Sequence, residues 1–318
     1  MEKERRDQKS KKIVFMGTPL IATYALKGLI DLGHQIICVV TQTDKVSGRK
    51  KEIIFSETKT FALQNNLHVI QTESMIDLYK ILKDMDFDYI FTCAYGKFIS
   101  DDVLELPKIK AVNMHASLLP KYRGGAPIHW AIINQEKVTG ISLIKMEKKM
   151  DAGEIYFQDS IQIDLDDTTS SLTLKMGELI YRSIIKNFDY FIDNKFQPII
   201  QNENDVTFAL NIKREQEKIN WEQSSDAIHA FVRGLFDKPF AFTLINNIEI
   251  KIIATEISDI KSSLLPGTVS NITSDGIFVS TKTNDIKITM LKIAGKAAVS
   301  VKDFINGNRI FSINSKFS

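Results

Sequence analysis

The sequence predicts an α/β fold, in which a mostly parallel sheet covered by helices is followed by a smaller, mostly β domain. Two observations predict it. Up to about residue 195, short β-branched and apolar runs alternate with helical patterns, as they do where helices join parallel strands. Beyond residue 210, short strands of alternating polarity follow one another with turn residues between them, which is typical of an antiparallel barrel or sandwich.

The elements of the first domain follow in chain order. Lys12–Met16 is a β-branched and aromatic run that ends at Gly17, and the helical pattern after it closes at Gly33. Gln35–Thr41 is apolar on both faces, as buried parallel strands are. The same alternation predicts helices at 61–64, 75–85 and 168–194, strands at 68–70, 89–94 and 110–115, and two further apolar stretches at 140–146 and 155–163.

The second domain follows an aperiodic segment. Residues 196–206 show neither the periodicity of a helix nor that of a strand, and are interpreted as a linker. The helical pattern of Asp226–Arg233 then precedes the β region. Turn dipeptides then separate strands expected at 240–245, 249–254, 269–272, 277–281 and 286–293. We therefore expect a charged tail at 1–11, a first domain at 12–195, a linker at 196–210 and a β domain at 211–318.

Composition and charge exclude several classes of protein. Hydrophobic residues make up 44% of the chain and charged residues 25%, which indicates a folded globular protein and not a disordered chain. Cys38 and Cys93 match no zinc or redox spacing, and the opening segment resembles no secretory signal, so we expect a cytoplasmic protein without a membrane span. The net charge of +2 combines a mildly acidic body with basic ends, which suits either a large anionic partner or a solvated surface.

The first candidates for chemistry lie at the end of the strand expected at 110–115. Asn113 and His115 are two residues apart, so in a strand they project from the same face, near the end where open α/β sheets bind ligands. An amide donor beside an imidazole can stabilise an oxyanion and move protons, as acyl transfer requires. Alternatively, the pair is a strand end with two hydrogen-bonded polar side chains.

Two loops add to this pair. The Pro and Gly content of Ser117–Ile128 indicates a loop, yet its two leucines should be buried against protein or a flat apolar ligand, and Pro127 begins a helix that continues to Asn134. Asp151, which precedes a turn glycine, either caps that turn or orients the imidazole of His115.

A basic loop bears on the binding of phosphates, and the absence of a glycine-rich motif bears on the binding of a dinucleotide. Thr41–Glu52 holds four Lys and Arg, which either contact phosphates or are solvated. Gly17-Thr18-Pro19 is not followed by the further glycines of a dinucleotide fingerprint, which argues against a nucleotide-dependent oxidoreductase.

Together these residues resemble the methionyl-tRNA formyltransferase family, over nearly the whole chain after Lys11. Asn113-Met114-His115, the stretch Ser117–Ile128 and Asp151-Ala152-Gly153 are the parts specific for folate-dependent formyl transfer. The other matches are Phe15–Pro19, Thr41-Gln42, Asp44, Gly48-Arg49, Ala94–Gly96, Thr139-Gly140, Ile219–Trp221, Arg233-Gly234 and Ala294–Lys296, of which the last three indicate the tRNA-directed branch.

The resemblance implies a Rossmann-like formyltransferase catalytic domain at 12–195 and an OB-like β-barrel that helps to hold tRNA. It implies that a cytoplasmic monomer transfers the formyl group of 10-formyltetrahydrofolate to the α-amino group of methionyl-initiator tRNA, for translation initiation, without a metal. The matching catalytic positions are Asn113, His115 and Asp151. The matching folate-binding positions are Ser117, Leu118, Leu119 and Pro120, and those directed at tRNA are Arg49, Lys50 and Lys51.

The chemistry of these side chains fits that reaction. Attack of the amine on the formyl carbon forms a tetrahedral oxyanion, to which Asn113 and His115 would donate hydrogen bonds worth about 3–4 kcal/mol each. Asp151 would hold His115 and assist removal of the amine proton. We therefore expect the three groups, from separate strand ends, to meet at one reacting carbon.

The sequence departs from the family pattern at several positions. Thr43 and Val46 stand where prolines are common in the basic loop, and Asn211 and Lys238 differ on the side expected to meet tRNA. The alternatives are a formyltransferase for an amino-sugar nucleotide, a formyltetrahydrofolate hydrolase, and an RNA-binding protein without catalysis. The basic C-terminal half argues against the first two, and the presence of Asn113 and His115 against the last.

Overall fold

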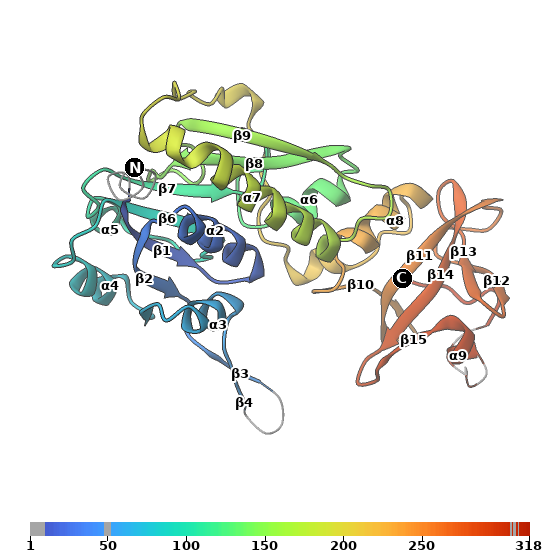
Figure 1. Cartoon of the computed structure of the whole chain (residues 1–318). Coiled ribbons are helices and arrows are strands. Elements are labelled where there is room, and N and C mark those ends of the chain that lie inside the picture. Colours follow the sequence, from blue (N-terminus) through green and yellow to red (C-terminus); the bar gives the residue numbers. More distant parts are fainter. Residues whose placement is uncertain (1–9, 48–51, 306, 308–309, 311) are drawn as a thin grey trace. The chain divides into compact units, whose positions relative to one another are not determined.

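The computed structural model describes residues 10–47, 52–305, 307, 310 and 312–318 (Figure 1). The chain divides into two compact units, one made of residues up to 127, 138–162 and 173–210, and the other of 128–137, 163–172 and 211–318. The expected domain limits stay a prediction, and two short segments inside the expected first domain, 128–137 and 163–172, cluster with the second unit.

The first unit is built on a seven-stranded sheet in the order β5-β2-β1-β6-β7-β8-β9. The strands from β5 to β7 pair in parallel, whereas β8 is antiparallel to both β7 and β9. The predicted mostly parallel sheet is confirmed, with an antiparallel edge. The strands are β1 (Lys12–Gly17), β2 (Gln35–Thr41), β5 (Val69–Gln71), β6 (Tyr89–Cys93), β7 (Lys110–His115), β8 (Val138–Lys145) and β9 (Ile155–Gln162).

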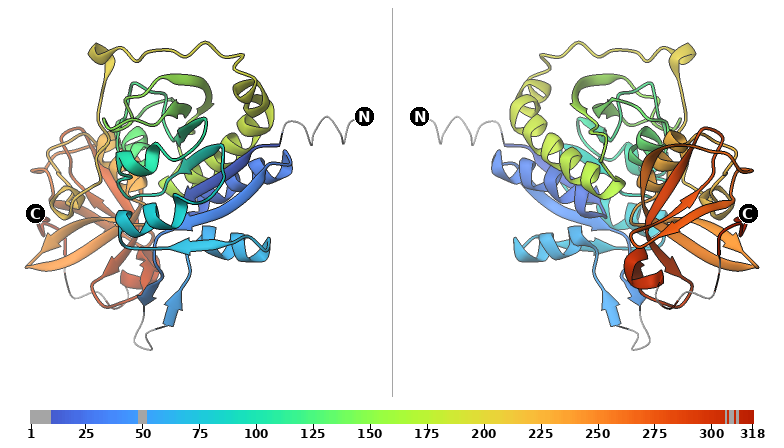
Figure 2. Two further views of the ribbon diagram at one scale, coloured as in Figure 1. Left: turned by 90° about the vertical axis from the view of Figure 1, so that its left-hand side faces the viewer. Right: turned by 90° about the vertical axis from the view of Figure 1, so that its right-hand side faces the viewer.

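Helices cover both faces of this sheet because its strands are apolar on both sides (Figures 1 and 2). On one face, Met16 of β1 belongs to a buried cluster with Leu78 of α4 and Val103 of α5. On the other, Phe91 of β6 packs edge-on against Phe188 of α7, with ring centroids 5.6 Å apart. The helices are α2 (Leu20–Asp31), α3 (Glu57–Gln64), α4 (Met75–Leu82), α5 (Asp101–Leu104) and α7 (Thr169–Ile192).

The second unit is an antiparallel β structure, as the sequence predicts. Its strands run in the order β10-β11-β14-β13-β12, with β15 beside β14. In its core, the ring of Trp221 stacks on Phe317 with centroids 5.6 Å apart, and the indole N–H donates to Thr243 Oγ1 at 3.0 Å. The elements are α6 (Pro127–Ile133), α8 (Ser225–Gly234), β10 (Ala241–Ile245), β11 (Ile248–Lys261), β12 (Val269–Thr273), β13 (Gly276–Val279), β14 (Asn284–Ile293), β15 (Ala298–Ser300) and α9 (Val301–Ile305).

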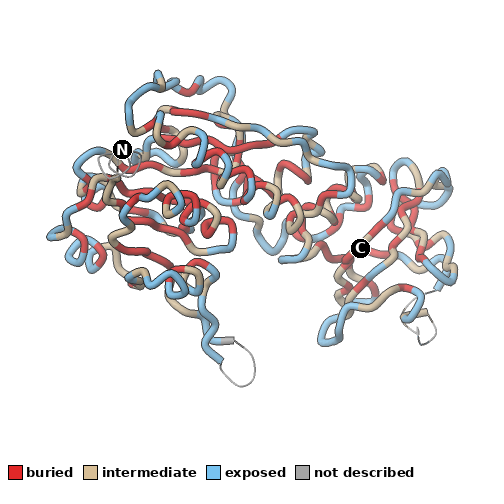
Figure 3. Tube along the Cα trace, viewed as in Figure 1, coloured by how far each residue is buried: buried red, intermediate tan, exposed pale blue. Residues whose placement is uncertain are grey.

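Part of the basic loop after β2 is a hairpin that the sequence pattern does not predict. β3 (Lys45–Ser47) pairs antiparallel with β4 (Glu52–Ile54), and the hairpin projects away from the sheet (Figures 1 and 2). Lys45, Val46 and Glu52–Ile54 are exposed, so the apolar side chains of Val46, Ile53 and Ile54 face solvent. The tube coloured by burial shows exposed residues along these strands (Figure 3). The pairing therefore comes from the backbone and owes nothing to a buried core.

The segment expected to be a linker packs along the first unit. Its regular structure within 196–210 is one 3-10 turn, η1 (Glu203–Asp205), and a further turn, η2 (Arg214–Glu217), follows in the second unit. Arg123 donates its N–H to the carbonyl of Thr207 at 2.9 Å, and Ala209 donates back to the carbonyl of Arg123 at 2.7 Å. The segment therefore supports the loop that follows β7.

Candidate active site

Strand β7 presents Asn113 from the face that also bears Ala111 and His115. The hydroxyl of Thr92, on the neighbouring β6, donates to Asn113 Oδ1 at 2.8 Å. Because that oxygen is engaged, the amide nitrogen points the other way, toward Asp151, whose Oδ1 lies 3.4 Å from Nδ2. Asn113 is therefore oriented as a hydrogen-bond donor toward the loop that contains the carboxylate.

His115 is buried and held from the far side of its ring. Its Nε2 lies 2.9 Å from the carbonyl oxygen of Tyr122. A carbonyl can only accept, so Nε2 is the nitrogen that bears the hydrogen. Nδ1 then carries no hydrogen and is the nitrogen that can accept a proton. It faces Asp151 Oδ1 at 3.6 Å, a separation too long for a hydrogen bond but within ion-pair distance.

Asp151 lies on the turn after β8 and its two oxygens have separate partners. Oδ1 faces Asn113 and His115, while Oδ2 accepts the backbone N–H of Gly124 at 2.9 Å. The residue has a φ of +50°, a conformation that costs a non-glycine residue energy and must be held by its surroundings. The three side chains singled out from the sequence lie together.

The way they meet differs from the expectation that strand ends converge. β8 is antiparallel to β7, and its last residue, Lys145, pairs with Val112. β8 therefore ends beside the middle of β7, and the turn that follows lies against the face of β7. The sequence pattern could not show this, because it depends on strand direction and register.

The loop after β7 fixes the two catalytic candidates through its backbone. Tyr122 supplies the carbonyl for His115, and Gly124, two residues on, supplies the N–H for Asp151. Gly124 has a φ of +128°, and a Cβ there would lie 2.6 Å from the carbonyl oxygen of Ala209. Only glycine fits this position.

A buried arginine lies between these two backbone groups, and the sequence pattern gives no sign of its role. The side chain of Arg123 is fully buried, and its Nη2 donates to Glu203 Oε1 at 2.9 Å. Its Nε and Nη2 also donate to Gln201 Oε1, at 3.1 and 2.8 Å. The hydrogen bond from Arg123, and then that from Lys149, lowers the pKa of Glu203 below its ordinary value.

Two of the four residues expected to bind folate, Ser117 and Leu119, are buried in contacts within the protein. Ser117 is buried, and its carbonyl accepts the hydroxyl of Ser142 at 2.7 Å. Leu119 belongs to a small buried cluster with Ile144 and Ile155. Leu118 and Pro120 keep partly exposed surface, so they are the members of the stretch able to touch a ligand.

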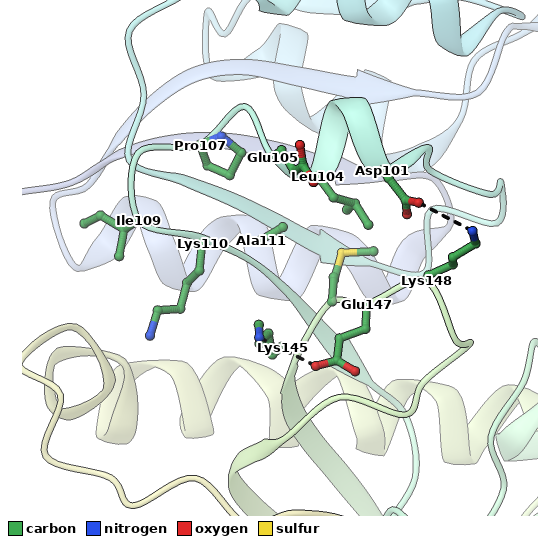
Figure 4. A pocket seen from close by; sticks show the side chains of 11 residues that line it. Asp101, Leu104, Glu105, Pro107, Ile109, Lys110, Ala111, Lys145, Glu147 and Lys148 are labelled. Carbon is green, nitrogen blue, oxygen red and sulfur yellow. Dashed lines mark ion pairs between the residues drawn. The ribbon is translucent and has the colours of Figure 1, made fainter.

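A cavity of about 470 Å³ lies near the same face of β7 (Figure 4). Ala111, two residues before Asn113, contributes to its wall together with Leu104 of α5 and Met146, which follows β8. Ion pairs at 3.9 Å between Lys148 and Asp101, and at 3.6 Å between Lys145 and Glu147, lie at its sides. The sulfur of Met146 also lies 3.4 Å from the Thr92 hydroxyl that holds Asn113.

Arg49, Lys50 and Lys51 lie outside the described residues. Within the described ranges, no group of three or more His, Cys, Asp and Glu side chains is placed to hold a metal ion. The helices in that part of the chain include none long and apolar enough to cross a membrane.

Comparison with known proteins adds to the geometry. A family model described as "Formyl transferase" matches residues 11–186, and one described as "Formyl transferase, C-terminal domain" matches 211–309. The chain is 44% identical to the methionyl-tRNA formyltransferase of Malacoplasma penetrans, with 97% of each chain covered. It is 41% identical to that of Mycoplasma mycoides, with 96% of this chain and 98% of the relative covered.

Solved structures share the fold at low identity. The sugar 3N-formyl transferase WlaRD has a TM-score of 0.65 and 23% identity, with 90% of this chain and 99% of that chain covered. HypX from Aquifex aeolicus, solved with tetrahydrofolic acid, has a TM-score of 0.65 and 16% identity, with 93% of this chain and 47% of that chain covered.

Proposed function

The chain belongs to the methionyl-tRNA formyltransferase family, and from that premise we propose that it moves the formyl group of 10-formyltetrahydrofolate onto the α-amino group of methionyl-initiator tRNA. The observation that supports this most strongly is the meeting of Asn113, His115 and Asp151 within hydrogen-bond or ion-pair distance on one face of β7. An amide donor, an imidazole and a carboxylate are the groups that acyl transfer to an amine needs.

In the proposed reaction, the neutral amine attacks the formyl carbon and the carbonyl oxygen takes the negative charge. The Asn113 amide donates to this oxygen, because its own oxygen is already bonded to Thr92. The amine proton passes to Nδ1 of His115, where Asp151 faces it. Collapse of the intermediate returns that proton to the departing folate nitrogen, so that no net charge remains on the enzyme.

The folate site is a second part of the proposal. Leu118 and Pro120 are the partly exposed members of the stretch assigned by family resemblance, and the cavity lined by Leu104, Ala111 and Met146 lies beside the same strand face. We propose that formyl-folate contacts both surfaces, and the tetrahydrofolic acid bound by HypX is consistent with this ligand class. Leu104→Trp should narrow the cavity and raise KM for formyl-folate, while KM for tRNA stays unchanged. An unchanged KM for both substrates would place the folate elsewhere.

The test of the function is an acceptor assay. Purified protein is incubated with formyl-folate and with methionyl-initiator tRNA, methionyl-elongator tRNA, free methionine or an amino-sugar nucleotide, and the product is identified by mass spectrometry. We expect formylated methionyl-tRNA, with the initiator preferred. Equal activity on free methionine or on the sugar nucleotide would overturn the acceptor, and release of formate without transfer would indicate a hydrolase.

A further inference from the structure

Gln201 lies in the segment that the sequence presents as a linker, yet it makes four hydrogen bonds beneath the proposed active site. Its side chain is buried, with a relative exposure of 6%. Oε1 accepts from Nε and Nη2 of Arg123 at 3.1 and 2.8 Å, and Nε2 donates to the carbonyls of Asp151 and Gly153, both at 2.8 Å. Both ends of one amide are therefore saturated, and they join two different loops.

At one end of this connection, the Gln201 side-chain oxygen contacts Arg123 in the loop after β7. Arg123 is the residue between the Tyr122 carbonyl that holds His115 and the Gly124 N–H that holds Asp151. Its guanidinium is buried, so it needs hydrogen-bond acceptors to compensate for lost water. Gln201 accepts two of its N–H groups, and a shift of Gln201 would shift the backbone on which both catalytic candidates depend.

At the other end, the Gln201 side-chain nitrogen contacts the turn after β8. Asp151 has a left-handed backbone conformation, which persists only where surrounding contacts hold it. The two hydrogen bonds from Gln201 hold the carbonyl of Asp151 itself and that of Gly153, two residues later. A Cβ at Gly153 would lie 1.9 Å from the carbonyl oxygen of Lys145, so this end of the turn has no room for a side chain.

We propose that Gln201 is a positioning residue, which ties the Arg123 loop to the Asp151 turn and so sets the separation of Asp151 from His115. The inference rests on the proposed roles of these two side chains in formyl transfer. Gln201 touches neither substrate nor the reacting atoms in this scheme. Its effect should therefore appear in the chemical step, because displacement by about 1 Å can lower the rate of a positioned reaction by about 100-fold.

The most selective variant is Gln201→Glu. The carboxylate can still accept from the buried guanidinium of Arg123, but it cannot donate to the two carbonyls of the Asp151 turn. We expect kcat to fall by about 10- to 100-fold, with KM for both substrates within about twofold of wild type. The folded fraction is measured by circular dichroism at the assay temperature, so that rates refer to folded protein.

A matched control exists in the same unit. Gln71 accepts from Lys59 at 2.7 Å and donates to the carbonyl of Gln42 at 2.7 Å and to Asp44 at 2.9 Å, far along the sheet at β5. Gln71→Glu removes the corresponding donors without touching the Asp151 turn, and we expect kcat to stay within about twofold of wild type.

A double-mutant cycle separates positioning from general destabilisation. If Gln201 acts through Asp151, then Gln201→Glu should cost little further rate, less than about threefold, once Asp151→Asn is present. Full additivity of the two losses, or a Gln201→Glu enzyme with wild-type kcat, would overturn the proposal. Wild-type activity of Asp151→Asn alone would instead overturn the proposed function of Asp151, so the two failures are distinguishable.

Discussion

Two loops of the first unit follow strands of the same sheet and are built in opposite ways. The loop after β7 is held from several sides: Ser117 and Leu119 are buried, and Tyr122 and Gly124 use backbone groups to hold His115 and Asp151. The hairpin after β2 exposes Val46, Ile53 and Ile54 to solvent, with relative exposures of 62%, 65% and 54%. The difference is that the loop proposed to serve catalysis has its backbone groups engaged in hydrogen bonds, whereas the described strands of the hairpin proposed to contact tRNA expose their side chains.

The largest effect should come from His115, whose ring is held by the loop after β7 through a hydrogen bond to the Tyr122 carbonyl. His115→Asn removes Nδ1 as a proton acceptor, and we expect kcat to fall by about 100- to 1,000-fold, as for loss of one group that stabilises a transition state. Binding of formyl-folate, measured by equilibrium titration, should change by less than about threefold. A variant with unimpaired turnover would remove His115 from the mechanism.

The sequence predicts the strands that precede the two loops, but it does not predict how Asp151 comes to lie beside His115. β2 and β7 have the bounds that their buried apolar runs predict, and the spacing of Asn113 and His115 places both on one face because strand side chains alternate. The proximity of Asp151 depends on β8 being antiparallel and ending beside Val112, which no local pattern shows.

Gln201 and the hairpin escape prediction for other physical reasons. Gln201 lies in an aperiodic segment, and its proposed role rests on hydrogen bonds to partners 50 and 78 residues away in the chain. The β3–β4 hairpin buries little apolar surface, so it leaves no hydrophobic period to detect. The basic residues at its centre, Arg49, Lys50 and Lys51, lie outside the described residues, and their proposed role in tRNA binding comes from resemblance alone.

The next largest effect is expected from Gly124→Ala, which tests whether the backbone of the loop after β7 tolerates a side chain at this position. Gly124→Ala places a Cβ 2.6 Å from the Ala209 carbonyl at a φ of +128°, so we expect a loss of about 2–4 kcal/mol in the free energy of unfolding and at least a tenfold fall in kcat. Urea denaturation and steady-state kinetics measure the two.

Gly33→Ala is the matched control for this substitution. Gly33 also has a positive φ, +84°, but a Cβ there would meet nothing within 4 Å. We expect a cost of about 1 kcal/mol from backbone strain alone and an unchanged kcat. If both variants lose the same kcat, close packing at Gly124 is not what protects the site.

A smaller effect is expected in the hairpin, and on a different parameter. If Arg49 contacts a tRNA phosphate, Arg49→Ala should raise KM for methionyl-tRNA by about fivefold, leave kcat unchanged and reduce the salt dependence of log KM by about 0.7–0.9. The control is Lys83→Ala, an exposed lysine at the end of α4. A fall in kcat with Arg49→Ala would mean that the hairpin takes part in chemistry, and the contrast between the loops would fail.

The smallest effect concerns Glu203, the exposed partner of the buried Arg123 side chain. The hydrogen bond from Arg123, and then that from Lys149, lowers the pKa of Glu203 below its ordinary value. The ion pair between Glu203 and Arg123 is therefore present at neutral pH and is lost only as the pH falls through the lowered pKa. Between pH 6 and 8, Glu203→Gln should overlay the wild-type kcat profile within about twofold, because the amide still accepts from Arg123. A profile that shifts in this range would show that Glu203, and not Gln201, governs the site.

The measurement that tests the central claim most directly is the single-turnover rate of formyl transfer by Asp151→Asn, with both substrates saturating. The account predicts a rate at least about 100-fold below wild type, while both substrates still bind, because the amide cannot stabilise a proton taken up by His115. A rate within threefold of wild type, in a folded enzyme, would show that the carboxylate beside the imidazole is not part of the reaction.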